Sequence, residues 1–160
     1  MGQMFKRQTR TASVISLPSK PRKESVLGLP ERDISSFYTF HRVLGEGHYG
    51  KVRRAMNKQT KERVAIKTIA KARIRKADNL RREVEILKAL SHPNIVRYVD
   101  VFEDSVAIHV VIELCTGGEL FDRVASEKFF SEAKAAGITR QILSAVAYMH
   151  SQGIVHRDLK

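Results

Sequence analysis

The spacing of apolar residues is mainly typical of strands in the first part of this chain and typical of helices in the last part, and that difference constrains the fold more than any other feature of the sequence. Short apolar segments typical of strands occur at 37–44, 51–55, 63–69, 95–102 and 106–114. Between the third and the fourth of these, residues 78–90 carry Leu80, Val84, Leu87 and Leu90 at helical spacing. After the Gly117-Gly118 pair the pattern predicts helices at 119–127 and, with Ser131 as an N-cap, up to His150. We therefore expect an α+β fold in which a strand-rich half precedes a helix-rich half.

Charge and cysteine content narrow the function classes. The 160 residues include 29 Lys and Arg against 17 Asp and Glu, a net charge of +12, which suits a phosphate-rich ligand, nucleic acid or an anionic membrane without choosing among them. The single cysteine, Cys115, excludes a disulfide framework within the chain and indicates a reducing compartment, so we expect a cytoplasmic or nuclear location. One cysteine and six scattered histidines show no zinc-ligand spacing. The apolar stretches are far shorter than the ~20 residues that span a bilayer, and the first thirty residues lack a signal-peptide core.

Residues 1–36 read as a basic flexible tail, with folded sequence beginning near Phe37. Within 1–32, seven Lys and Arg residues accompany only two acids, with Ser, Thr and Pro between them. The start of the chain almost fits an N-myristoylation signal, but Lys6 occupies the place of the expected Ser or Thr. A solvated tail is therefore the default, and membrane contact through the tail is a weak alternative. Ser13 and Ser25 each follow an arginine by three residues, which makes them candidates for autophosphorylation.

A glycine-rich motif, GEGHYGKV at residues 45–52, fits the pattern G-x-G-x-x-G-x-V. Glycine permits positive φ in a tight hairpin and lets backbone N–H groups approach phosphate oxygens. A polar turn and a strand follow, whereas a dinucleotide fingerprint and a Walker loop each require a helix there. Val52 also replaces the Ser or Thr of a Walker loop. The motif indicates a phosphate-binding hairpin, and on its own it leaves an ordinary glycine hairpin equally open.

A lysine inside an apolar strand needs a negative partner. Lys67 ends the segment VAIK and shares a strand face with Ala65 and Ile69. If that face is covered, an unpaired ammonium there costs several kcal/mol. Glu83 lies beside the apolar stripe of the 78–90 helix, so we expect it to pair with Lys67. The alternative is that Lys67 reaches solvent and Glu83 is a surface charge.

Together with two later motifs, these residues resemble the protein kinase family over about residues 38–160. IELCTGGELFDR at 112–123 is similar to the hinge and first large-lobe helix, and HRDLK at 156–160 to the opening of the catalytic loop. HPNIV at 92–96, GGELFDR and Lys160 resemble the calcium/calmodulin-dependent and calcium-dependent serine/threonine branch. The resemblance implies a five-stranded antiparallel small lobe with one helix at 37–114, a hinge at 115–118, and the first helices of an incomplete large lobe at 119–160.

The resemblance also implies roles for individual residues. The catalytic set would be Lys67, which holds the α- and β-phosphates of ATP, and Glu83, which pairs with Lys67. Asp158 would orient the substrate hydroxyl and accept its proton, and Lys160 would steady the transferring phosphoryl group. The nucleotide site would comprise Gly45, Glu46, Gly47, Gly50, Val52, Ala65, Lys67, Glu113, Cys115 and Glu119, with Tyr49 near the loop tip and Ile112 as gatekeeper. His156 would have a packing role. Asp158 has one plain alternative, an acid neutralised by Arg157.

The resemblance implies ATP and Mg²⁺ as cofactors, but the asparagine and the D-F-G aspartate that hold magnesium in the family are absent from residues 1–160. We therefore expect an ATP-dependent protein serine/threonine kinase whose 160-residue chain has little activity alone, with the metal ligands outside this chain. Protein substrates with basic residues before Ser or Thr, and a calcium sensor or calmodulin, are the implied partners. Two alternatives stay open: a non-catalytic nucleotide- or partner-binding fragment, and a basic binder using residues 1–32 and 71–82. For the last, no aromatic or groove-reading pattern supports nucleic acid.

Overall fold

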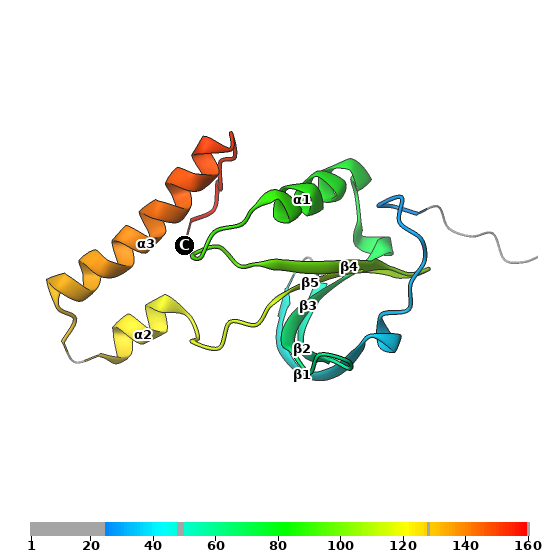
Figure 1. The fold of residues 1–160 in the computed structure, drawn as a ribbon, viewed down its shortest axis with the longest axis horizontal. Helices are drawn as coiled ribbons and strands as arrows, with labels where there is room; N and C mark the ends of the chain where they lie inside the picture. Colours follow the sequence, from blue (N-terminus) through cyan, green and yellow to red (C-terminus); the bar gives the residue numbers. More distant parts are fainter. Residues whose placement is uncertain (1–24, 48–49, 128, 160) are drawn as a thin grey trace, which may run out of the picture.

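The computed structural model describes residues 25–47, 50–127 and 129–159. Its strands are β1 (Tyr38–Gly47), β2 (Gly50–Asn57), β3 (Arg63–Ala70), β4 (Tyr98–Glu103) and β5 (Ala107–Glu113). They form one five-stranded antiparallel sheet in the order β1-β2-β3-β5-β4 (Figure 1). The predicted α+β fold, a five-stranded sheet with one helix followed by further helices, is confirmed.

Helix α1 (Ala77–Ala89) lies between β3 and β4 in sequence, as the helical spacing predicts. Two short 3-10 helices, η1 (Ile34–Ser36) and η2 (Lys71–Arg73), are additions that the sequence pattern does not indicate. The predicted strand at 95–102 begins later, at Tyr98. The reason is a turn at Pro93–Asn94 and a register irregularity between Tyr98 and Asp100, which together leave 95–97 outside regular pairing.

The two faces of the sheet are buried separately, because side chains alternate along each strand. One face carries a core of Ala55, Val64, Ile66, Phe102 and Val111, closed by Ile34 and Tyr38. The other face carries Ile69, Val101, Ile108 and Val110, covered by Leu80 and Val84 of α1. Val84 is 1% exposed, so it anchors the helix on this second face.

Residues 25–36 correct the prediction that folded sequence begins near Phe37. Val26, Leu27 and Leu29 pack against the core under α1, and Ile34 is 4% exposed in the opposite core. The sequence pattern did not predict this packing because basic residues surround the segment. Its few apolar side chains pack against residues that are distant in the sequence. The remainder of the predicted tail, including Lys6 and Ser13, lies outside the described residues.

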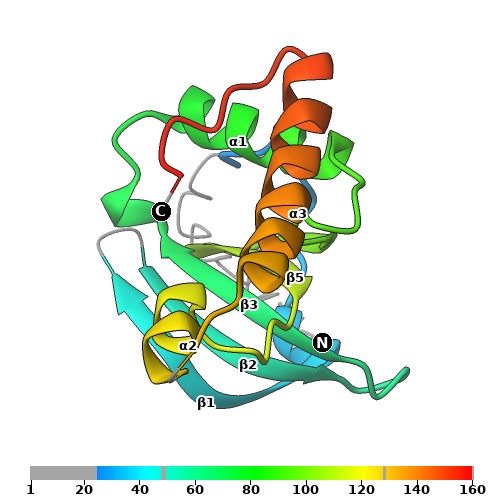
Figure 2. The same ribbon diagram turned by 90° about the vertical axis from the view of Figure 1, so that its left-hand side faces the viewer.

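The helix-rich half consists of α2 (Leu120–Ser126) and α3 (Glu132–Ser151), which lie to one side of the sheet in Figure 1 and in front of it in Figure 2. Ser131 caps α3 as predicted, its side chain accepting from the N–H of Lys134 at 3.3 Å. The predicted apolar stripe of α3 is only partly covered, since Ala145 and Met149 are buried whereas Ile142 is 42% exposed.

The loop between α1 and β4 attaches α3 to the strand-rich half. The N–H of Ser91 donates to the Tyr148 hydroxyl at 3.0 Å, and the His92 ring stacks on that of Tyr148 with centroids 5.2 Å apart. The Asn94 side chain donates to the carbonyl of Gln141 at 3.2 Å. The His-Pro-Asn segment is therefore a docking point as well as a helix end. No helix in the described part of the chain combines the length and apolar character needed to cross a membrane.

Candidate functional site

The glycine hairpin is built by the pairing of β1 with β2. Gly45 faces Val52, Glu46 faces Lys51 and Gly47 faces Gly50 across the two strands. Glu46 and Lys51 form an exposed ion pair of 3.1 Å. The tip of the hairpin, including Tyr49, lies outside the described residues.

The three glycines are not equivalent in the structure. Gly50 has a φ of +135°, and a Cβ there would lie 2.1 Å from the carbonyl oxygen of Thr68 on β3. At Gly45 and Gly47 a Cβ would meet nothing within 4 Å, and neither has positive φ. Gly50 is therefore required by the fold, whereas Gly45 and Gly47 have open space beside their backbone.

One face of the sheet collects the residues predicted to contact a nucleotide. Val52 pairs with Lys67, and Ala65 pairs with Ile112, so the register places all four side chains on the same face. Ala65 is 5% exposed, so this part of the face is apolar and closely packed. An apolar surface beside an ammonium group and a glycine hairpin matches the donor and acceptor chemistry of a nucleoside triphosphate.

Lys67 and Glu83 form an ion pair, with 3.5 Å between Nζ and Oε1. Their side chains are 33% and 54% exposed. The sheet face around Lys67 is therefore only partly covered, whereas the sequence-based prediction assumed that it was covered. An exposed pair of this kind contributes about 0–1 kcal/mol to stability. Its significance is therefore positional, since it holds the ammonium group at a fixed place on the sheet.

A pocket of about 790 Å³ lies between β3, the segment at 71–76 and α1. Lys67 and Glu83 line it together with Ile69, Leu80 and Asn79, and basic residues of the 71–76 segment close one side. None of the described glycine-hairpin residues contributes to its lining. The pocket thus lies beside the ion pair of Lys67 and Glu83.

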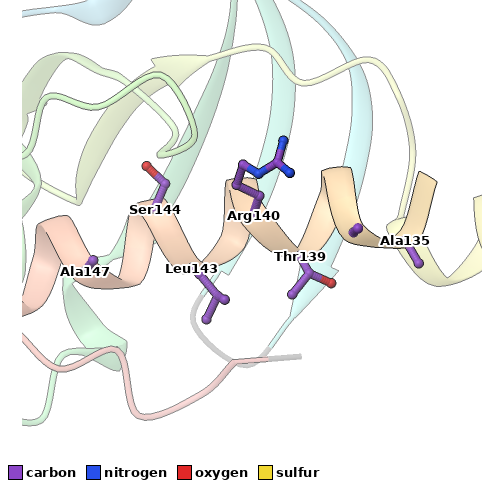
Figure 3. A pocket seen from close by; sticks show the side chains of 7 residues that line it. Ala135, Thr139, Arg140, Leu143, Ser144 and Ala147 are labelled. Carbon is purple, nitrogen blue, oxygen red and sulfur yellow. The ribbon is translucent and has the colours of Figure 1, made fainter. Parts of the chain in front are cut away.

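A second hollow runs along one face of α3 and contains none of the predicted site residues. Figure 3 shows its lining by Ala135, Thr139, Arg140, Leu143, Ser144 and Ala147, which all come from this one helix. Leu143 is 60% exposed. This hollow is an uncovered helix face with no cluster of chemically reactive groups, and we assign it no role.

The segment after β5 provides the predicted hinge residues. Glu113 ends β5, and its N–H donates to the carbonyl of Arg97 at 2.9 Å, so a ligand would have to use its carbonyl oxygen. Cys115 is an exposed free thiol, and Glu119 is exposed at the N-terminus of α2. Gly118, with φ of +77°, turns the chain between the strand-rich and helix-rich halves.

The predicted catalytic segment follows α3 and turns back from the end of that helix toward the sheet, as both Figures 1 and 2 show. Arg157 has a φ of +68°, which is uncommon for a residue with a side chain and marks local strain next to Asp158. The His156 ring accepts the N–H of Asp158 at 3.2 Å, and His156 is exposed. The predicted packing role of His156 is thus replaced by a hydrogen bond to the neighbouring backbone. Lys160 lies outside the described residues.

Sequence reasoning missed a buried ion pair near the site. Lys71 and Glu103 lie 2.8 Å apart, and their side chains are 8% and 2% exposed. Burial raises the pKa of Glu103, but hydrogen bonds from Lys71 and from residues 25–27 outweigh it and hold that pKa below its usual value. Nothing in the local pattern distinguishes Glu103 from an ordinary strand-end acid. Because Lys71 is buried in this pair, it is not available for the basic patch that the 71–82 alternative requires.

The described residues do not offer a magnesium site of the kind that the resemblance implies. Residues 25–47, 50–127 and 129–159 contain no group of three or more His, Cys, Asp or Glu side chains placed to hold a metal ion.

Comparison with known proteins matches this chain to one protein family. The model of the family described as protein kinase domain matches residues 38–160. The chain is 46% identical over 129 residues to calcium-dependent protein kinase 5 of Plasmodium berghei (strain Anka), which covers 80% of the chain and 23% of that protein. It is 45% identical over 130 residues to myosin light chain kinase A of Dictyostelium discoideum, covering 80% of the chain and 44% of that protein. Calcium-dependent protein kinase 7 of Arabidopsis thaliana is 44% identical over 143 residues, with 86% and 27% covered. The chain thus spans less than half the length of each of these relatives.

Proposed function

The chain belongs to the protein kinase family, and from that premise we propose that it forms the nucleotide-binding part of an enzyme that transfers the γ-phosphoryl group of ATP to serine or threonine hydroxyls of proteins. The observation that carries the proposal is the common sheet face of Val52, Ala65 and Lys67 beneath the glycine hairpin, with Glu83 paired to the lysine. The kinase names of the relatives support the same activity.

In this proposal each residue performs a step that its chemistry allows. Val52 and Ala65 bind the adenine ring through apolar contact, and the backbone of Glu113 and Cys115 binds its polar atoms. Lys67 donates to the phosphates, and its ion pair with Glu83 helps to hold the ammonium group in position. Asp158 orients the substrate hydroxyl and accepts its proton, and Lys160 stabilises the charge on the transferring group.

Binding and catalysis are expected to separate in the 160-residue polypeptide. We expect it to bind ATP, measured by isothermal titration calorimetry, and to transfer no phosphoryl group to a peptide with arginine three residues before serine. A chimera that appends the sequence following the matched region of the Plasmodium berghei relative after Lys160 should gain transfer activity. The Asp158→Asn form of the chimera serves as the matched inactive control.

The alternative of a non-catalytic binding module predicts a different pair of results. It requires nucleotide or partner binding together with a chimera that stays inactive even though it folds and binds ATP. A polypeptide that binds no ATP at all would contradict the assignment of the sheet face as a nucleotide site and would leave only a partner-binding module. Calcium regulation is a further proposal that the relatives' names suggest, and calcium-dependent activity of the intact enzyme would test it.

A further inference from the structure

A short segment before the first strand is fastened to a buried carboxylate that takes no part in the proposed chemistry. We name residues 25–29 the N-terminal strap. Ser25 Oγ donates to Glu103 Oε2 at 2.9 Å, and the N–H groups of Val26 and Leu27 donate to Oε1 at 2.5 Å and to Oε2 at 2.9 Å. Glu103 ends β4 with its side chain 2% exposed. The strap is therefore attached at one inward-facing acid.

Lys71, from the η2 segment that joins β3 to α1, forms an ion pair with the same carboxylate. Lys71 Nζ lies 2.8 Å from Glu103 Oε1 and its side chain is 8% exposed. A buried charge pair tolerates the loss of a partner poorly, because the charge left behind is not solvated. A new charge beside Glu103 therefore acts on a buried carboxylate that Lys71 already neutralises and that is shielded from water.

Helix α1 is attached to the strap from the other side. The Arg81 guanidinium donates to the carbonyl of Val26 from Nε at 3.2 Å and from Nη2 at 2.7 Å. The apolar residues of the strap pack against the core that contains Leu80 and Val84. Arg81 precedes Glu83 by two residues on the same helix. The position of the strap is thus coupled to the helix that holds Lys67 in place.

We propose that Ser25 is a regulatory phosphorylation site and that its phosphorylation detaches the N-terminal strap from Glu103, loosens α1 and weakens the hold of Glu83 on Lys67. The last effect rests on the proposed function, whereas the release of the strap does not. Ser25 is exposed, and Arg22 stands three residues before it, which suits a kinase that recognises basic residues.

The chemistry of the modification explains the release. Ser25 Oγ attacks the γ-phosphorus of ATP in the modifying kinase, the bond from that phosphorus to the bridging oxygen of ADP breaks, and the hydroxyl proton passes to the catalytic carboxylate of that kinase. The ester oxygen then has no proton to donate, and the phosphate adds a charge of about −1.5 to −2. A hydrogen bond to Glu103 becomes a repulsion between two acceptors, while Lys71 is already engaged with the same carboxylate.

The test uses the 160-residue protein with phosphoserine incorporated at position 25 during synthesis. Amide hydrogen exchange, read by mass spectrometry over residues 26–32 and 77–89, should accelerate at least tenfold in both segments. Phosphoserine at position 13 is the matched control, because Ser13 has the same upstream arginine and gains the same charge. It should leave both segments within twofold of the unmodified protein, as should Ser25→Ala, since the N–H groups of Val26 and Leu27 still bind Glu103.

Unchanged or slower exchange in the phosphoserine-25 protein would overturn the proposal, the slower case meaning that Lys71 or Arg81 captures the phosphate. The Arg81→Gln variant tests the coupling: phosphoserine 25 should still accelerate exchange in 26–32 but add less than twofold in 77–89. An undiminished response of α1 in that variant would refute the route through Arg81. Exchange needs no nucleotide, so a protein that responds in this way without binding ATP contradicts the proposed function alone.

Discussion

Replacement of Gly50 by alanine tests how the glycine hairpin is held against the sheet. The new Cβ would lie 2.1 Å from the Thr68 carbonyl oxygen and 3.1 Å from its carbonyl carbon. Carbon and oxygen atoms in contact normally lie about 3.3 Å or more apart, so β2 or β3 has to move by more than about 1 Å. The φ of +135° adds strain, because side chains rarely adopt that conformation.

The size of the expected loss of stability follows from the close contact with Thr68 and from the strained φ of Gly50. A residue held in a glycine-only conformation costs about 1–3 kcal/mol, and overpacking a tight contact costs about 1–3 kcal/mol. We therefore expect Gly50→Ala to lower the free energy of unfolding by about 2–6 kcal/mol. The shift also reaches the neighbouring pair of Val52 and Lys67, so ATP affinity should fall at least tenfold.

Urea unfolding followed by far-ultraviolet circular dichroism measures the effect. Gly47→Ala is the matched control, since a Cβ at Gly47 meets nothing within 4 Å, and its unfolding free energy should stay within about 1 kcal/mol of the parent protein. Equal midpoints for the two variants would refute the close approach of Gly50 to β3.

Three further outcomes follow from the ion pair and the shifted pKa values. Lys67→Met should change the unfolding free energy by less than about 1 kcal/mol, yet weaken ATP binding at least tenfold by calorimetry; a much larger loss of stability would contradict the exposed pair with Glu83. Because the pKa of Glu103 is lowered in the folded state, its contribution to stability is complete above its unfolded value of about 4.3 and is lost as pH falls through the folded value. Urea midpoints should therefore drop between about pH 5 and 3, and Glu103→Gln should flatten this drop. Burial, followed by nearby acids, raises the pKa of Tyr98 to about 12. The stability that its neutral form contributes is therefore complete below the unfolded pKa of about 10 and is lost as pH rises towards 12. Tyr98→Phe should remove this loss of stability at alkaline pH.

The local sequence pattern was sufficient to predict the strands, helix α1 and one ion pair. The strand alternation around Ala65 and Lys67 and the helical stripe around Val84 are each complete within about a dozen residues, so the sheet, α1 and the Lys67–Glu83 pair could be predicted from sequence alone. The Ser131 cap was equally local, because a serine before an apolar helix satisfies the first free N–H groups within one turn.

Distance along the chain explains what was missed. The partners of Glu103 in residues 25–27 lie 76 to 78 residues earlier in the chain, so neither its burial nor the folding of residues 25–36 leaves a local signature. The difference between Gly50 and Gly47 is equally invisible in the motif, because it depends on the approach of Thr68 from another strand. The His156 contact and the positive φ of Arg157 arise from the return of the chain after α3, which spacing does not encode.

The N-terminal segment also bears on how this sheet avoids joining another. β4 is an outer strand, and outer strands present unpaired backbone groups on which a second chain can add a strand. Here the Arg32 N–H donates to the Glu103 carbonyl at 3.2 Å, and the Arg32 guanidinium lies over the Phe102 ring, 4.3 Å from its centroid. Residues 25–32 therefore cover part of the β4 edge, and detaching or trimming them would open that edge to strand addition by a second chain.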